Sequence, residues 1–344
     1  MALPPAPTGL TDESGAPRFG TYEGALPTVD LARLQGPYAL SPLARLARHK
    51  RWLYAFVATR EVALLSAVVD VGYSANAFSM AVDLGTGAVL HDVSALGLPP
   101  MVSVSLAPDD GVEAQFRSPG LSVRGARPLG ADRLALAVRA GTPVRPKLSV
   151  AAELLCAGAP PPLTVVAPVE GHGVNVTMKR AGLLSFGELT AGGKRYVLDG
   201  GVGGFDYTRG HLARHTAWRW AFGCGRLADG TPVGFNLVQG FNESRADVNE
   251  NALWVGGKLH PLGRARFSWR KDEVLDPWAV ETDDGVLKLA FKPLAAHREE
   301  RNLGLVKSHF VQPVGLFDGT VTLDGVSRPL SKIPGVTEDQ DVLW

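Results

Sequence analysis

Short segments rich in β-branched and aromatic residues recur along most of this chain, and turn residues separate them. Residues 52–58, 62–71 and 77–84 are the first three such segments, and the turn Gly85-Thr86-Gly87 follows the third. Side chains of this kind favour the pleated, half-buried surface of a sheet. Turn signals at roughly 8–12-residue spacing are typical of sandwiches and barrels. The pattern therefore predicts an all-β fold.

One short helix is predicted near the N-terminus. Ser41 is a favourable N-cap and Pro42 suits the first helical position. Leu43 and Leu46 follow at helical spacing, which indicates an amphipathic helix that ends at the basic residues 48–51.

The chain has 344 residues, enough for two domains. The proline-rich segment 158–162 cannot pair as a central strand, so a domain boundary is predicted there. Residues 1–40 are predicted to be a loop segment, 41–160 a first β-barrel domain, and 161–344 a second β-barrel domain that carries most of the motif residues. The polar tail after Leu330 is predicted to be peripheral, with docking of its last residues 342–344 as the alternative.

Charge and composition exclude several classes of partner. The net charge is +1 and no basic stripe is present, so neither nucleic acid nor an anionic membrane is indicated, although contact with a membrane surface stays open. No signal peptide and no transmembrane segment are recognisable, and Cys156 and Cys224 set no disulfide framework. We expect a cytoplasmic protein; the sequence sets no oligomeric state.

Polar residues inside apolar, strand-like runs mark residues 194–269 as the region of interest. A buried polar group costs roughly 1–3 kcal/mol unless it is paired, so these groups form either a closed structural network or the lining of a pocket. Asp206 follows a glycine-rich run and Glu250 precedes an apolar segment, so both carboxyl groups are candidate proton donors. For Asp206 a local turn is the alternative, and for Glu250 a structural hydrogen-bond network.

Further residues of this region are candidates for ligand binding. Trp218 and Trp220 are two apart and share one face of a strand, where they wall a pocket or pack in a core. Tyr207 and Arg209 are candidates for orienting a polar group, and Trp254 for an apolar wall. The carboxamide candidates are Asn236, Gln239, Asn242 and Asn251.

Signatures of cofactor and metal chemistry are absent from the sequence. No nucleophile elbow, P-loop or dinucleotide-binding motif is present. His211 and His215 are four residues apart, but no third ligand accompanies them. We therefore expect no cofactor and no metal.

Several motifs, taken together, resemble a known family. The ordered series comprises Lys179 and residues 206–210, 218–221, 234–237, 250–254, 298–302 and 308–315. It resembles the bacterial family catalogued as domain of unknown function 2804, over about residues 50–323. The layout is also similar to that of the two-barrel, lipocalin-like proteins of the carotenoid hydratase and tocopherol cyclase group. That resemblance implies two tandem lipocalin-like barrels or sandwiches and an apolar cavity for isoprenoid, polyketide or fatty ligands.

Three functional hypotheses follow. In the first, the chain binds a lipophilic small molecule and performs cofactor-free hydration, cyclisation or isomerisation, with Asp206 or Glu250 as proton donor. In the second, it carries such a ligand without catalysis. In the third, Asp206 and Glu250 are a carboxylate pair acting on carbohydrate.

Overall fold

The computed structural model describes residues 2–142, 145–302, 304 and 306–344. In this part of the chain the strands form one 14-stranded and one nine-stranded sheet, with antiparallel pairing throughout. Among the described residues the one α-helix is α1 (Pro42–Arg48), and Ser41 caps it by accepting a hydrogen bond from Ala44 N. The predictions of an all-β fold and of one short helix starting at Ser41 are both confirmed.

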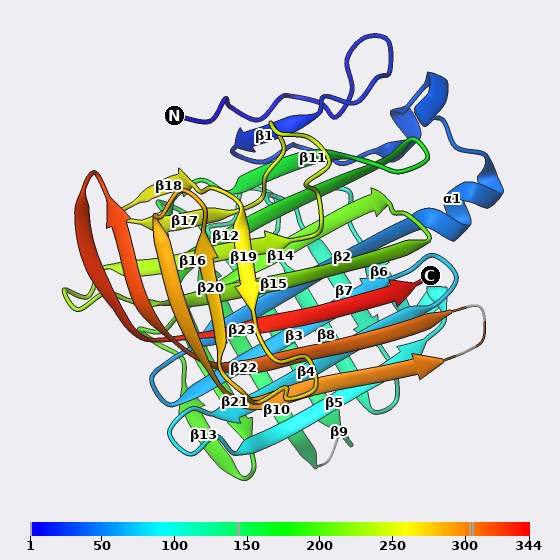
Figure 1. Cartoon of the computed structure of the whole chain (residues 1–344). Coiled ribbons are helices and arrows are strands. Elements are labelled where there is room, and N and C mark those ends of the chain that lie inside the picture. The colour runs from blue at the N-terminus through cyan, green and yellow to red at the C-terminus, as the bar shows by residue number, and fades with distance from the viewer. Residues whose placement is uncertain (1, 143–144, 303, 305) are drawn as a thin grey trace.

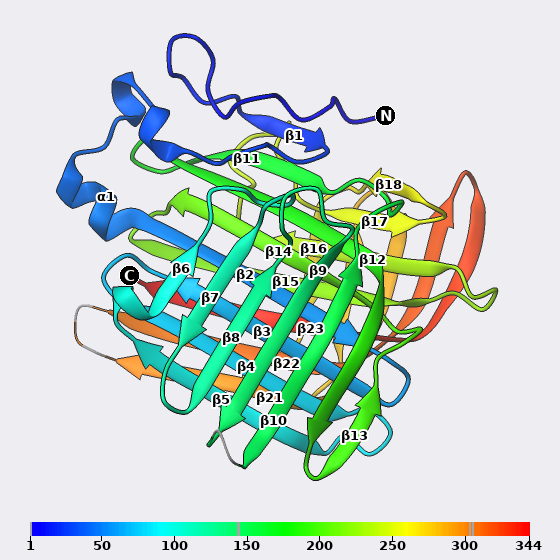
Figure 2. The ribbon, with the colours of Figure 1, turned by 180° about the vertical axis from the view of Figure 1, so that it is seen from behind.

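The 14-stranded sheet folds back over itself, which gives two layers. The middle layer consists of β5 (Val89–Gly97), β4 (Ala75–Asp83), β3 (Val62–Asp70), β2 (His49–Ala58), β14 (Val202–His211), the first half of β12 (Gly173–Ala191), β11 (Leu163–Val169) and β1 (Gly20–Glu23). The outer layer consists of the second half of β12, β13 (Lys194–Val197), β10 (Pro146–Leu155), β9 (Arg133–Gly141), β8 (Leu121–Ala126), β7 (Glu113–Arg117) and β6 (Val102–Val104). Figure 2 shows the outer layer crossing in front of the middle one.

Strand β12 joins the two layers because it bends in its centre. The pairing register with β14 shifts between Arg180 and Leu183, and Gly182 there has φ +76°, a conformation that favours glycine. The first half of β12 pairs with β11 and β14, and the second half pairs with β10 and β13.

The nine-stranded sheet covers the other face of the middle layer. Its order is β18 (Lys258–Pro261), β17 (Ala252–Val255), β16 (Pro232–Gln239), β15 (His215–Arg226), β23 (Val326–Leu343), β22 (Lys307–Leu323), β21 (Leu287–Asn302), β20 (Trp278–Thr282) and β19 (Ala265–Ser268). Figure 1 shows this sheet curling in front of the middle layer. Short 3₁₀ turns occur at η1 (Leu31–Arg33), η2 (Gly36–Tyr38) and η3 (Pro99–Met101).

Successive side chains of strand β2 point to opposite faces of the middle layer, so this layer contributes to two hydrophobic cores. Leu53 and Val57 point toward the outer layer, into a core shared with β6–β10. Tyr54 and Phe56 point the other way, into a core shared with β15 and β23 of the nine-stranded sheet. A strand buried on both faces is apolar at consecutive positions, as the sequence of β2 is.

The chain passes from one sheet to the other between β14 and β15. Residues 158–162 lie between β10 and β11, which both belong to the 14-stranded sheet. Within residues 1–40 the structure contains β1, η1 and η2. The division into domains at residue 160 stays a prediction.

The prediction of a peripheral tail after Leu330 is wrong. This segment belongs to β23, which lies at the centre of the nine-stranded sheet between β15 and β22. Its polar residues Thr337, Glu338, Asp339 and Gln340 are buried. Polarity alone is misleading here, because Glu338, Asp339 and Gln340 are paired inside the protein rather than solvated.

None of the helices in the described segments has both the length and the apolar character needed to cross a membrane.

Close backbone approach between β16 and β12 fixes how the nine-stranded sheet packs. A Cβ atom at Gly234 would lie 2.5 Å from Gly182 N and 2.6 Å from Ala181 Cβ. We expect Gly234→Ala to lower the free energy of unfolding by roughly 1–3 kcal/mol, because the two layers must separate. Denaturant unfolding measures this change. Gly120→Ala is the control, since a Cβ at Gly120 meets no atom within 4 Å; equal stability of the two variants would contradict the prediction.

Candidate functional site

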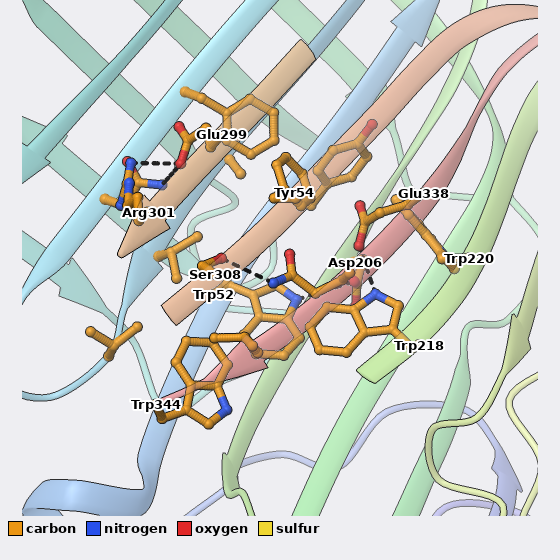
Figure 3. A pocket seen from close by; sticks show the side chains of 18 of the residues that line it. Trp52, Tyr54, Asp206, Trp218, Trp220, Glu299, Arg301, Ser308, Glu338 and Trp344 are labelled. Atoms are coloured by element: carbon orange, nitrogen blue, oxygen red, sulfur yellow. Dashed lines mark hydrogen bonds and ion pairs between the residues drawn. The ribbon is translucent and has the colours of Figure 1, made fainter. Parts of the chain in front are cut away.

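A cavity lies between the middle layer and the nine-stranded sheet. It encloses about 180 Å³ and is lined by residues of β2, β3, β4, β5, β12 and β14 on one side and of β15, β16, β21, β22 and β23 on the other. Because facing sheets present alternate side chains, each strand contributes residues at every second position. Figure 3 shows the aromatic side chains and carboxyl groups that face this space.

Aromatic rings form the walls near the inner end. Trp218 stacks on Trp52 with ring centroids 6.2 Å apart, and Phe241 packs against Trp218 at 5.2 Å. Trp220 meets Tyr54 edge to face at 5.0 Å. The prediction that Trp218 and Trp220 share one face is confirmed, and that face lines the cavity.

The Lys179 ammonium joins the two predicted carboxyl groups. Lys179 Nζ lies 2.9 Å from Asp206 Oδ1 and 3.2 Å from Glu250 Oε2, and all three residues are buried. The other Asp206 oxygen accepts a hydrogen bond of 3.3 Å from Trp52 Nε1, and Thr177 donates to Oδ1. The attraction of Asp206 and Glu250 overcomes the effect of burial and raises the pKa of Lys179. Lys179 is therefore a cation.

Glu250 sits in a chain of carboxamides. Asn242 Nδ2 donates to Glu250 Oε1 at 3.1 Å, and Asn175 donates in turn to Asn242. Asn236 donates to the Glu250 carbonyl oxygen and accepts from Trp220 Nε1. Burial raises the pKa of Glu250, and the nearby charge of Asp206 adds to that rise.

Glu338 is a third buried carboxyl group that the sequence did not single out. Its Oε1 accepts a hydrogen bond of 2.6 Å from Trp218 Nε1, and its Oε2 accepts one of 2.5 Å from Gln312 Nε2. Burial raises the pKa of Glu338 to about 7, and the charge of Asp206 acts in the same direction. Unlike Asp206 and Glu250, Glu338 has no cation within 4 Å in the described part of the chain. It is therefore half-protonated near neutral pH.

Two predicted ligand-binding residues lie on the opposite face of β14. Tyr207 and Arg209 alternate with Asp206 and point into the core under the outer layer. Tyr207 donates to Ser105 O at 2.7 Å, and Arg209 donates to Val104 O at 2.7 Å. Both hold the middle layer to β6 and the loop after it.

The remaining candidates are structural neighbours of the cavity rather than part of its lining. Asn251 Oδ1 accepts from Val238 N, and Gln239 Oε1 accepts from Phe267 N. Trp254 Nε1 donates to Pro161 O at 2.9 Å. Of the eleven residues predicted for the site, four line the cavity: Asp206, Glu250, Trp218 and Trp220.

A polar group lines the outer part of the cavity. Glu299 and Arg301 of β21 form an ion pair at 2.5 Å, and Asn76 of β4 donates to Glu299 at 3.2 Å. Ser308 and Gln340 lie nearby and are hydrogen-bonded to each other. Figure 3 shows Glu299 and Arg301 apart from the carboxyl groups of Asp206 and Glu338. The cavity thus has a polar region at each end and aromatic walls between.

The raised pKa of Glu338 predicts how the free energy of unfolding depends on pH. Between pH 4.5, the ordinary value, and pH 7 the folded protein keeps a proton that the unfolded chain has released, so this group lowers stability as pH rises. Glu338→Gln removes that titration. We expect the stability of the variant relative to wild type to increase by up to about 3 kcal/mol across this window. Denaturant unfolding at a series of pH values measures it, with Glu13→Gln at an exposed position as control; parallel pH profiles for wild type and Glu338→Gln would refute it.

Comparison with solved structures places this geometry in a known fold. The chain superimposes on CghA with a TM-score of 0.53 at 15% identity, covering 99% of this chain and 98% of that one. The structure of CghA with Sch210972 gives a TM-score of 0.52 at 14% identity, with coverage of 99% and 98%. A protein described as AttH (NE1406) from Nitrosomonas europaea gives 0.51 at 11% identity, with coverage of 86% and 92%. The fold is thus all-β with two lipocalin-like barrels, as expected.

Comparison with curated protein sequences gave no match. A family model, in contrast, matches residues 5–344 and therefore nearly the whole chain, including Lys179, Asp206, Glu250 and Glu338. The chain belongs to the family described as domain of unknown function DUF2804.

Proposed function

We propose that the cavity binds an apolar or amphipathic small molecule and that Glu338 transfers a proton to it without a cofactor. The reaction class is hydration, cyclisation or isomerisation of an unsaturated compound, and isoprenoid, polyketide and fatty compounds are the candidate ligands. The observation that carries the proposal is a buried carboxylic acid, with a pKa of about 7, on the wall of an aromatic cavity. A general acid works best when its pKa is close to the working pH.

The position of Glu338 changes the assignment made from the sequence. Asp206 and Glu250 are both held by the Lys179 ammonium, at 2.9 and 3.2 Å. Glu338 has only the neutral donors Trp218 and Gln312, so near neutral pH it still carries a proton that it can donate to a substrate. Glu338 is the proton donor in this proposal, and Asp206 remains bound to Lys179.

The aromatic walls suit the intermediate that such a protonation forms. Transfer of the Glu338 proton to one carbon of a double bond leaves a cation at the other carbon. The rings of Trp218 and Tyr54 on the cavity wall stabilise a positive charge, while the ring of Trp220 already faces the Lys179 ammonium. Loss of a proton to the Glu338 carboxylate gives isomerisation or cyclisation. Addition of water, with its proton returned to the same carboxylate, gives hydration.

A carrier without catalysis is the second candidate. The hydrogen-bond capacity of Asp206 and Glu250 is taken up by Lys179, Trp52 and Asn242, which is what a purely structural network requires. CghA, which shares the fold, has been crystallised with Sch210972, so the fold holds a small molecule in that protein. The two candidates differ in whether Glu338 is needed for turnover.

A role on carbohydrate has less support. Asp206 and Glu250 bind the same Lys179 Nζ atom, at 2.9 and 3.2 Å. The lysine therefore occupies the space that a glycosidic bond would need between an acid and a nucleophile.

The first experiment identifies the ligand. The protein is purified from its native host and analysed by non-denaturing mass spectrometry, then by organic extraction. We expect a bound unsaturated lipophilic compound, which then serves as substrate. With this compound we expect Glu338→Gln to lower kcat by at least about 100-fold with little change in binding, because the amide keeps the shape but has no acidic proton.

Matched variants separate catalysis from transport. Rotation of the Gln312 amide accommodates the new NH₂ group in Glu338→Gln, so the cavity keeps its form. Glu243→Gln, outside the cavity lining, is the control for a lost carboxylate. Product formation at the wild-type rate by Glu338→Gln would remove the proposed role of this residue. Ligand binding without turnover by the wild-type protein would favour the carrier.

A further inference from the structure

Helix α1 exposes its apolar side chains instead of burying them. Leu43 is 77% exposed and Leu46 is 52% exposed, and no residue of the helix is buried. An amphipathic surface helix normally turns its leucines toward the core. The amphipathic pattern predicted from the sequence is present, but its apolar side faces outward.

These leucines stand beside the cavity opening. Lys50 Nζ donates to Ala47 O of α1 at 2.6 Å and to Val71 O at 2.9 Å, and it lies over the rings of Tyr73 and Trp344. Val71, Tyr73 and Trp344 all line the cavity. Figures 1 and 2 both show α1 and the C-terminus on the same side of the molecule.

The apolar surface continues along the strand ends at the opening. Leu96, which lines the cavity, is 57% exposed and pairs across the sheet with Asn76 of the same lining. Leu98, two residues on, is 66% exposed. We call Leu43, Leu46, Tyr73, Leu96 and Leu98 the apolar rim. Exposed apolar groups gathered around an opening mark a binding surface more strongly than scattered ones do.

The charge beside the apolar rim is positive. Helix α1 carries Arg45 and Arg48 and no acidic residue. Arg48 donates to the carbonyl oxygens of Glu170, Gly171 and Leu212. Among the described residues Arg48 has no carboxylate within 4 Å. Near Leu96 of the rim, Glu299 is paired with Arg301 and accepts a hydrogen bond from Asn76.

We propose that the apolar rim and α1 dock on the surface of an anionic lipid bilayer, with the cavity opening toward the lipid. Leucines that enter the interface beside Arg and Lys that stay at the headgroups are the pattern of helices that lie on membranes. The net charge of the whole chain is +1 and does not indicate such a surface, because the positive charge is confined to this part of the molecule. The surface would give a lipophilic compound a path between bilayer and cavity that avoids water.

Vesicle co-sedimentation tests the proposal without any cavity ligand, so its outcome is independent of the proposed reaction. The probes are vesicles of phosphatidylcholine alone and of phosphatidylcholine with phosphatidylglycerol. We expect the wild-type protein to bind the anionic vesicles, and to bind less at high salt. Leu43→Glu combined with Leu46→Glu should weaken binding at least about tenfold, because two charged groups cannot enter the interface.

Val326→Glu is the matched control. Val326 is 57% exposed and begins β23, whose other end reaches the opening at Trp344. Figure 1 shows the β22–β23 hairpin on the side of the molecule opposite α1. The control should bind as wild type does, and thermal melts should show all variants folded. Absence of wild-type binding to anionic vesicles would overturn the proposal. Equal binding of the wild-type protein to both vesicle types would also overturn it. So would a loss of binding in Val326→Glu as large as that in the double leucine variant.

Discussion

The ammonium of Lys179 is the interaction on which the site depends. It lies between carboxylates from two different layers, Asp206 on β14 of the middle layer and Glu250 just before β17 of the nine-stranded sheet. Removing an ion from water costs several kcal/mol, and only good geometry with further hydrogen bonds repays that cost. Here Trp52, Thr177 and Asn242 supply those bonds. An offset of the sheets by one residue would leave a buried charge without a partner, so the triad favours one relative position of the layers.

The same arrangement determines the chemistry of Glu338. Lys179 satisfies two of the three buried carboxyl groups, and the third is held by neutral donors close to Asp206. A carboxyl group with no cation, in an apolar wall and near a negative charge, favours its protonated form. The pKa of about 7 is thus a consequence of how the charges are shared, and not of Glu338 alone.

Features of the fold and of the site that depend on local sequence pattern could be predicted from the sequence. The all-β fold, the helix start at Ser41 and the shared face of Trp218 and Trp220 follow from composition and period. The same period places Tyr207 on the face of β14 opposite Asp206, so the sequence also contains the signal that separates these two residues. Glu338 could not be found in this way, because its burial depends on β23 pairing between β15 and β22. Strand β15 lies far before β23 in the sequence, and local polarity indicates a solvated tail. The outward-facing Leu43 and Leu46 likewise depend on where α1 packs.

Burying polar groups at the inner end of the cavity costs free energy, which argues against a protein that only stores a ligand. A cavity that only stored apolar compounds would be more stable with apolar residues at Lys179, Asp206, Glu250 and Glu338, since buried ionic groups often stabilise less than well-packed hydrocarbon. Glu338 adds a further cost above its ordinary pKa, because its charge is unfavourable where it stands. Strained or destabilising groups that persist in a cavity are more readily explained by function than by packing. The structural triad accounts for three of these residues, but packing gives no such account of Glu338. Proton transfer does account for Glu338, because it requires an acid placed beside the aromatic walls of the cavity.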